Sequence, residues 1–382
     1  MIQRRPAAGA ERYRPRMAKA ARSTPARAAG TPPAPAPGGA ASASDARGSD
    51  GDGSRWVDGW GRHIESLRIS VTDRCNFRCL YCIPEPDIEW LPRSQLATLE
   101  ELARIARIAV AGGVRKLRIT GGEPLLRRNL PHLVAQLAAL PGLEDLALTT
   151  NGTELPRLAG ALRDAGLRRV NVSLDSLDRE RFARLAQRDA LPAVLAGIDA
   201  AEAAGLVPIS INCVAIRGLN DDEAVDFARL ARERGFEVRF IEFMPLEHGH
   251  RWSADTLVPG HELRARIEAV FPLRPAPDQD PHAPSRDWVF ADGAPGRLGF
   301  IDSVTAPFCS TCNRIRLTAD GKLRTCLFSL REHDLLGPLR AGASDEELAE
   351  LLAAAVATKE LKHHVGDGLF VKPERTMSQI GG

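Results

Sequence analysis

The sequence lacks any run of about 18 apolar residues, so no segment is long and apolar enough to cross a membrane as a helix. It also lacks a strong charge of either sign, because a formal net charge of +2 over 382 residues does not indicate a surface that coats nucleic acid. Hydrophobic residues make up 44% of the chain, which argues against disorder of its main part. This length suffices for one large α/β domain, a smaller unit and a tail.

An even set of cysteines, the mark of a disulfide framework, is also missing. The chain has seven cysteines, and six of them fall into two tight groups. This distribution is typical of metal ligation in a reducing compartment. We predict that the seventh, Cys213, is a buried thiol in a strand, because a free cysteine commonly packs as a small hydrophobic residue.

Residues 1–54 have too few large apolar side chains to form a core. They are rich in Ala, Pro, Arg, Gly and Ser, and we predict a disordered, dispensable extension. The arginines superficially suggest an organelle transit peptide, but no apolar stretch follows Arg4 and Arg5 as it would in a twin-arginine signal. Translation that starts at Met17 is another interpretation of this segment.

Strand-like and helix-like segments alternate from residue 67 onward. Helices are expected at 99–111, 130–140, 155–165 and 221–234, together with a longer helical stretch that ends at Gly205. Strands are expected at 67–71, 114–120, 144–149, 169–173, 207–215 and 236–242. Six parallel strands with external helices fit either an open doubly wound sheet or a curved partial barrel, and both place chemistry at the carboxyl ends of the strands.

The first cysteine group follows the first predicted strand with the spacing C-x3-C-x2-C. Cys75, Cys79 and Cys82 could bind three irons of a four-iron cluster and leave the fourth iron open for a substrate or cofactor. The alternative is a zinc knuckle, although zinc sites favour paired C-x2-C elements.

The second group consists of Cys309, Cys312 and Cys326. These residues could bind a second four-iron cluster with an open iron, or zinc if His333 supplied a fourth ligand. Between them, Arg314 and Arg316 would point the same way on a strand, where planar guanidinium groups suit a phosphate or a purine edge.

Several motifs together resemble one family of radical S-adenosylmethionine (SAM) enzymes, the GTP 3′,8-cyclases. The resemblance covers residues 55–382, and the double cysteine group with its NRIRLTADG insert is the most specific part. The motifs are the cysteine loop at 75–82, GGEPLLR at 121–127, TTNG at 149–152, NVSLD at 171–175, RFIEFM at 239–244, FCSTCNRIRLTADGKLRTCLF at 308–328 and the terminal Gly381-Gly382.

The resemblance implies a partial (β/α)6 barrel at 55–245. It also implies a C-terminal domain at 246–382 that carries the auxiliary cluster and a GTP-binding segment and ends in a Gly-Gly tail. In the family, the first cluster cleaves SAM to a 5′-deoxyadenosyl radical, which takes the C3′ hydrogen of GTP. C3′ then attacks C8 of the guanine, which docks on the second cluster, as the first step of molybdenum cofactor biosynthesis.

The same resemblance assigns roles residue by residue. Cys75, Cys79 and Cys82 would hold the first [4Fe–4S] cluster, and Cys309, Cys312 and Cys326 the second. The SAM contacts would be Tyr81, Gly122, Glu123, Ser173 and Met244. The GTP contacts would be Arg68, Arg118, Thr149, Ser210, Arg314, Ile315 and Arg316. Gly381 and Gly382 would be catalytic, with the tail threading into the barrel mouth.

One position departs from the family pattern. Ser210, two residues before Asn212, stands where the family usually has a lysine that contacts the triphosphate. The loss of this cation should weaken GTP binding unless Arg217 or another basic residue substitutes.

The expected partners are GTP, a flavodoxin- or ferredoxin-like electron donor and the next pathway enzyme, cyclic pyranopterin monophosphate synthase. No nucleic acid or membrane is expected, a homodimer is compatible with the resemblance, and a bacterial cytoplasmic location is predicted. Two other interpretations are a radical SAM enzyme with an auxiliary cluster that modifies a peptide, and a non-enzymatic protein that binds zinc and a nucleotide.

Overall fold

The computed structural model describes residues 55–83, 88–247 and 251–381, so the predictions for residues 1–54 and Met17 lie outside the described residues. The six predicted strands are all present and parallel. They are β1 (Ser66–Ser70), β2 (Lys116–Thr120), β3 (Asp145–Thr150), β4 (Arg169–Ser173), β5 (Ser210–Ala215) and β6 (Glu237–Glu242). They lie side by side in chain order, which is the arrangement of right-handed strand–helix–strand repeats.

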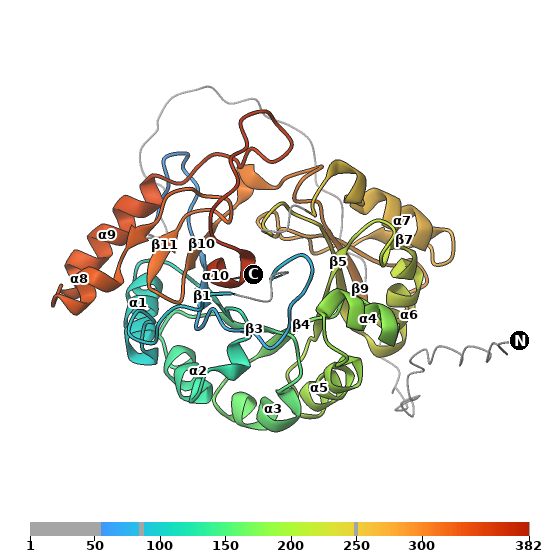
Figure 1. Cartoon of the computed structure of the whole chain (residues 1–382), viewed down its shortest axis with the longest axis horizontal. Coiled ribbons are helices and arrows are strands. Elements are labelled where there is room, and N and C mark those ends of the chain that lie inside the picture. Colours follow the sequence, from blue (N-terminus) through green and yellow to red (C-terminus); the bar gives the residue numbers. More distant parts are fainter. Residues whose placement is uncertain (1–54, 84–87, 248–250, 382) are drawn as a thin grey trace, which may run out of the picture.

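Helices cover the outer side of these strands, as Figure 1 shows. They are α1 (Leu99–Ala111), α2 (Leu130–Ala138), α3 (Leu155–Asp164), α4 (Arg179–Ala186), α5 (Leu191–Ala203) and α6 (Ala224–Arg234). The predicted capping box of α1 is confirmed, because Glu101 N donates to Thr98 Oγ1 at 3.1 Å and Thr98 N donates to Glu101 Oε2 at 2.7 Å. The long helical stretch before Gly205 is two helices, α4 and α5, rather than one.

The C-terminal part extends the same sheet at both edges, so that the described residues form a single 12-stranded sheet. On one side, β9 (Arg297–Ile301) runs parallel to β6 and is followed outward by β8 (Arg286–Phe290) and β7 (Leu273–Pro275). On the other side, β10 (Arg314–Leu317) runs parallel to β1 and is followed by β11 (Lys322–Arg324) and β12 (His333–Asp334). The sheet curves into an open barrel, which confirms the predicted partial barrel and excludes a flat doubly wound sheet.

The remaining helices are α7 (Gly260–Glu268), α8 (Leu336–Arg340), α9 (Asp345–Ala357) and the short C-terminal α10 (Met377–Ile380). In Figure 1, α10 and the C-terminus lie in the middle of the ring of strands. The proposed division at residue 245 stays a prediction, since both parts contribute strands to one sheet.

One large apolar core lies between the strands and the helices, and Cys213 is buried in it on β5, as predicted. A smaller apolar cluster of Leu246, Phe328 and Val365 lies under the C-terminal segment and contacts Cys326 and Met377. Among the described residues, no helix has the length and apolarity that spanning a bilayer requires.

Candidate active site

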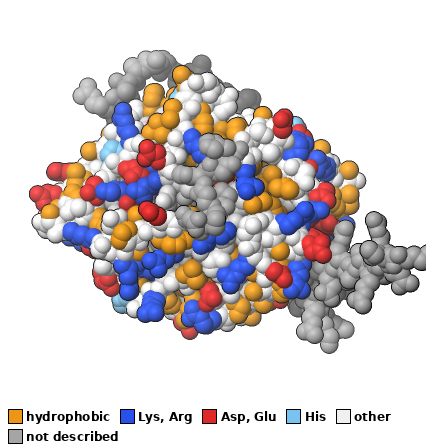
Figure 2. Space-filling view, in the orientation of Figure 1, with side chains coloured by type: hydrophobic (Ala, Val, Ile, Leu, Met, Phe, Trp, Pro, Cys, Tyr) orange, Lys and Arg blue, Asp and Glu red, His pale blue; other side chains and the backbone are white. Residues whose placement is uncertain are grey.

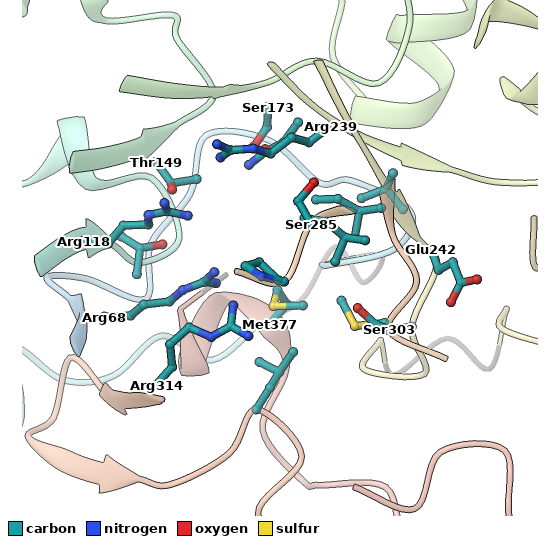
Figure 3. A pocket seen from close by; sticks show the side chains of 18 of the residues that line it. Arg68, Arg118, Thr149, Ser173, Arg239, Glu242, Ser285, Ser303, Arg314 and Met377 are labelled. Carbon is teal, nitrogen blue, oxygen red and sulfur yellow. The ribbon is translucent and has the colours of Figure 1, made fainter. Parts of the chain in front are cut away.

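A cavity of about 560 Å³ fills the middle of the barrel, and both cysteine groups line it. Figure 3 shows polar and basic side chains that point into this space from several strands. Residues more than 200 positions apart meet here because β10 pairs with β1 and brings the second cysteine group beside the first strand. The two groups, separate in sequence, therefore belong to one site.

The first cysteine group lies on the loop that follows β1. Cys75, Cys79 and Cys82 all line the cavity, and Cys82 N donates to Cys79 O at 2.9 Å in a tight turn. Phe77 N donates to Cys75 Sγ at 3.4 Å. A backbone N–H group therefore points at the sulfur of a predicted cluster ligand. Burial raises the pKa of the Cys75 thiol to about 11. Iron would displace these thiol protons on binding.

The second cysteine group lines the same cavity from the segment on either side of β10. Burial alone would raise the pKa of Cys312, but the charges of Arg314 and Lys359 outweigh it and bring the pKa to about 6. Arg62 Nη1 donates to Cys309 O at 2.6 Å and holds the start of this group in place. The donor set therefore suits a thiolate-ligated centre.

The zinc alternative finds no preformed site. His333, the suggested fourth ligand, lies on β12 next to Thr358 and does not line the cavity. In the part of the chain that the structure describes, no three His, Cys, Asp or Glu side chains converge closely enough to hold one metal ion. In a four-iron cluster each cysteine binds a different iron, so the three thiols need not converge on one ion.

The Gly-Gly-Glu motif packs against the segment that leads into the cysteine loop. A Cβ atom on Gly121 would lie 2.4 Å from Thr72 O, and one on Gly122 would lie 2.4 Å from Arg74 O. These glycines allow the loop after β2 to approach the loop after β1, which is a structural reason for the motif. A direct contact of Gly122 with SAM stays a prediction.

Glu123 links this motif to the third strand. Its carboxylate accepts hydrogen bonds from Thr150 Oγ1 at 2.7 Å, Asn151 N at 2.7 Å and Leu125 N at 3.0 Å. Burial raises its pKa to about 7, although these hydrogen bonds oppose the shift. Glu123 lines the cavity and retains lone pairs that can accept from a SAM ammonium group, so its contact with SAM stays a prediction. Its hydrogen bonds to the protein already give it a structural role.

The other predicted SAM positions belong to the same cavity. Tyr81, Ser173 and Met244 all line it. Tyr81 Oη donates to Asp175 Oδ2 at 2.7 Å, and Asp175 Oδ1 accepts from Val214 N at 2.9 Å. The orientation of the Tyr81 ring therefore depends on Asp175, to which the sequence did not assign a role.

A row of arginines crosses three neighbouring strands on the cavity side. The register aligns Arg316 with Arg68 and Arg68 with Arg118, while Arg314 is one pleat away. Burial and the charges of neighbouring arginines lower the pKa of Arg118 to about 9 and that of Arg316 to about 10, and the pKa of Arg68 is also lowered. Buried cations that repel one another favour a bound polyanion.

Neither Arg68 nor Arg118 forms an ion pair with any residue for which the structure gives a position. Thr149, another predicted GTP contact, also lines the cavity, near Arg118 in Figure 3. Free guanidinium groups that line a cavity suit a ligand that carries phosphates, and here they lie beside the second cysteine group, since Arg314 donates to Cys312 Sγ at 3.9 Å.

Two predicted GTP contacts do not line the cavity. Ser210 is fully buried and donates to Glu237 Oε2 at 2.8 Å, so Glu237 separates it from the cavity. The Ile315 side chain is fully buried in the core, on the opposite face of β10 from its arginine neighbours. Arg217 cannot substitute for the missing lysine either, because it is paired with Glu262 and does not line the cavity.

Sequence reasoning missed several basic residues of the cavity. Arg239 lines it and donates to Glu237 Oε2 at 2.6 Å, beside the hydroxyl of Ser210. Lys116, Arg169 and Arg297 line it as well and are paired with acidic residues. Alternation along each strand could have identified Lys116 beside Arg118, whereas Arg297 required knowledge that β9 joins the barrel.

The C-terminal tail enters the barrel mouth. Gly381 is buried, its carbonyl accepts a hydrogen bond from Arg316, and its φ of +89° is a conformation that favours glycine. A Cβ atom there would lie 2.3 Å from Ser70 Oγ. Gly382 lies outside the described residues, and a catalytic role for the pair stays a prediction.

Comparisons with known proteins agree with this geometry. Residues 69–231 match the Radical SAM superfamily, and residues 236–365 match Molybdenum Cofactor Synthesis C. A GTP 3′,8-cyclase of Moorella thermoacetica is 48% identical over 84% of this chain and 98% of its own length. A GTP 3′,8-cyclase of Corynebacterium glutamicum is 47% identical over 87% of this chain and 90% of its own length.

Solved structures show the same fold. Streptococcus suis SuiB bound to precursor peptide SuiA superposes with a TM-score of 0.53 at 12% identity, over 78% of this chain and 65% of that one. Native anSMEcpe with bound AdoMet gives a TM-score of 0.53 at 14% identity, over 78% of this chain and 82% of that one. From its near-complete match to the two cyclases and its two family domains, the chain belongs to the GTP 3′,8-cyclase family of radical SAM proteins.

Proposed function

We propose that this chain converts GTP to (8S)-3′,8-cyclo-7,8-dihydroguanosine 5′-triphosphate in the first step of molybdenum cofactor biosynthesis. The observation that carries the proposal is the single cavity that both cysteine groups and the arginine row line together. As a member of its family the chain carries two [4Fe–4S] clusters and uses SAM. With SAM bound, the first cluster supplies a 5′-deoxyadenosyl radical.

The residues of the chain bind and orient the reactants. Cys75, Cys79 and Cys82 hold the first cluster, with Tyr81 and the Gly-Gly-Glu loop beside it. Cys309, Cys312 and Cys326 hold the second cluster across the cavity. The arginine row binds the triphosphate, which places the nucleoside between the two clusters.

The cavity also protects the reaction from water. The tail at Gly381 covers part of the mouth, and buried strand residues form the wall. Exclusion of solvent matters because a carbon-centred radical otherwise undergoes side reactions. An external flavodoxin- or ferredoxin-like protein supplies electrons, and cyclic pyranopterin monophosphate synthase receives the product.

Anaerobic purification followed by iron and sulfide counting tests the proposal. About eight irons per chain, four for each cluster, are expected. Incubation with SAM, GTP and dithionite should yield 5′-deoxyadenosine and the cyclised triphosphate. A protein that contains zinc without iron, or that cleaves SAM in the presence of GTP without forming the cyclised nucleotide, would contradict it.

A further inference from the structure

A second depression, separate from the central cavity, lies against the first cysteine loop and has a volume of about 310 Å³. Its lining combines three arginines, three leucines and a glutamine and contains no carboxylate. These residues are Leu80, Arg181, Arg184, Leu185, Gln187, Leu219 and Arg251. The proposed reaction does not use any of them, so the depression needs a different explanation.

One wall of the depression is the peptide segment that carries the cluster ligands. Leu80 directly follows Cys79, and its N–H donates to Leu185 O at 3.0 Å. Arg78 N donates to Ala186 O at 3.1 Å, so the cysteine loop is attached to the C-terminal end of α4. A molecule seated in the depression would therefore lie close to the first cluster without entering the central cavity.

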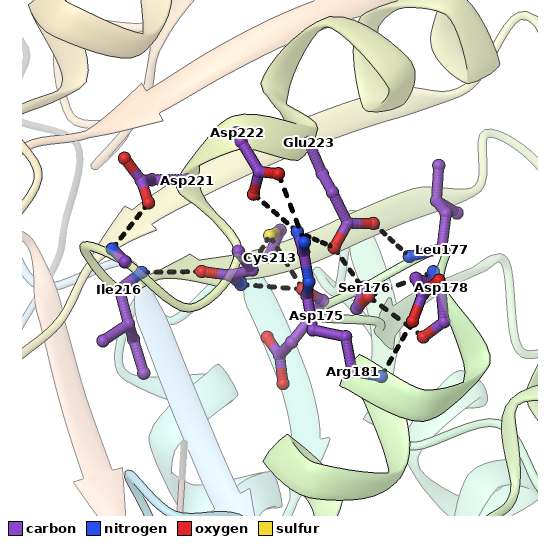
Figure 4. Close-up of polar contacts among 12 residues, drawn as sticks. Asp175, Ser176, Leu177, Asp178, Arg181, Cys213, Ile216, Asp221, Asp222 and Glu223 are labelled. Carbon is purple, nitrogen blue, oxygen red and sulfur yellow. Dashed lines mark hydrogen bonds and ion pairs between the residues drawn. The ribbon is translucent and has the colours of Figure 1, made fainter. Parts of the chain in front are cut away.

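The rim of the depression carries uncompensated positive charge. Arg181 is neutralised, because it pairs with Asp222 at 2.5 Å and Glu223 at 2.9 Å (Figure 4). In contrast, Arg184 and Arg251 are exposed and form no ion pair with a described residue. Figure 2 shows Lys and Arg side chains interspersed with Asp and Glu over the face seen in Figure 1.

Further arginines carry this charge along the cysteine loop. Arg188 is exposed and donates to Asn76 O at 2.8 Å, and Arg74 is also exposed. Arg78 lies over the ring of Trp90, 5.1 Å from its centroid. Basic side chains thus border the loop of the first cluster on its accessible side, next to the apolar surface of Leu80.

Because the proposed reaction consumes electrons, the first cluster must be reduced from outside the barrel. Both cysteine groups line the central cavity, which at about 560 Å³ is too small to admit a protein-sized reductant. Electron transfer weakens steeply with distance, so a donor must approach the cysteine loop closely. Redox partners meet through small interfaces, and complementary charge steers their encounter.

We propose that this depression and its rim, Arg184 and Arg251, form the docking site of an acidic one-electron carrier protein. The inference rests on the proposed function and adds to it the surface that receives the electron. Carboxylates of the carrier would pair with the two arginines, and an apolar side chain would contact Leu80 and Leu219. In the transfer the carrier loses one electron and the first cluster gains it, and no covalent bond changes.

The test uses the full chain with both clusters and a purified acidic bacterial flavodoxin as the probe. The double variant Arg184→Glu/Arg251→Glu reverses both rim charges. Arg274→Glu is the matched control, since Arg274 is an exposed arginine on β7 at the far edge of the sheet, with no described ion pair. Binding is measured by calorimetry at low and at moderate salt, and 5′-deoxyadenosine is measured with flavodoxin hydroquinone or dithionite as reductant.

The double variant should raise the dissociation constant for flavodoxin about tenfold at low salt and lose most of its salt dependence. Flavodoxin-driven 5′-deoxyadenosine formation should fall in parallel, while dithionite-driven turnover and iron content stay at the wild-type level. Unchanged flavodoxin binding in the double variant, or equal losses in Arg274→Glu, would overturn the proposal. Loss of product with dithionite in the wild-type protein would instead count against the proposed function.

Discussion

Replacement of Gly381 by alanine should remove cyclisation while leaving the fold and both clusters in place. The residue has φ +89° and ψ +105°, a combination that L-residues avoid. An added Cβ atom would lie 2.3 Å from Ser70 Oγ and 2.9 Å from Thr120 Cγ2. Both neighbours are buried in the barrel strands, so they cannot move aside without disturbing β1 and β2.

The free-energy cost of alanine at position 381 has two parts, one from the backbone conformation and one from overpacking. A non-glycine residue in such a conformation costs about 1–3 kcal/mol. Overpacking of a closely packed site costs a further 1–3 kcal/mol or so. Together they disfavour the inserted tail by about 2–6 kcal/mol, which lowers the equilibrium constant for its insertion at least about thirtyfold. The tail is terminal, so it can leave the mouth without unfolding the barrel, and its contact with Arg316 is then lost.

The assay compares Gly381→Ala with Gly368→Ala. Gly368 is exposed, lies in the same C-terminal segment and has open space where a Cβ atom would be added. We expect at least a tenfold loss of cyclised product for Gly381→Ala, with normal iron content and melting temperature, and no loss for Gly368→Ala. Hydrogen exchange of residues 377–381 should increase only in the first variant. Near-normal product formation by Gly381→Ala would refute the reasoning and show that the tail is a frayed end.

Three further predictions concern the clusters and the triphosphate site. Cys75→Ser should abolish SAM cleavage, whereas Cys309→Ser should retain some 5′-deoxyadenosine but no cyclised product; full cyclase activity in Cys309→Ser would exclude its role in guanine docking. Arg118→Gln should weaken GTP binding by about 1.5–3 kcal/mol, roughly 10- to 150-fold by calorimetry, because it removes a charged donor; an unchanged affinity would place the triphosphate elsewhere. Ser210→Lys should lower the GTP dissociation constant, but by less than about tenfold, because Glu237 would neutralise much of the new charge; weaker binding would show that the buried lysine disturbs the β5–β6 pair.

Local patterns in the sequence were sufficient to predict the six central strands of the barrel. Each strand from β2 to β6 is a short, largely apolar run that follows the end of a helix, and such signals depend on neighbouring residues only. The capping box at Thr98 and Glu101 is local as well, and it was confirmed. The long helical stretch before Gly205 was predicted undivided, whereas α4 is capped at its C-terminal end by Gln187 in the left-handed conformation. Pro192 in the first turn of α5 was the local signal that could have marked the second helix start.

Contacts between distant strands could not be predicted in the same way. The sequence suggested a strand around Arg314 but could not show that it pairs with β1, which puts Arg316 and Arg68 in one row. The sequence also could not show that the side chain of Glu237 on the neighbouring strand accepts a hydrogen bond from the buried Ser210, whose role as a GTP contact stays a prediction. Arg239, which shares that glutamate, was missed.

The sequence by itself determined the chemistry that the chain can support, since the spacing of Cys75, Cys79 and Cys82 within one loop and the composition of the second group are local properties. Only the tertiary structure decided that both groups and the arginine row line one cavity, and that Gly381 of the tail contacts Arg316 of this row. The physical reason is that strand pairing joins segments far apart in the chain, and the apolar surface they bury together selects their order, which no single segment encodes.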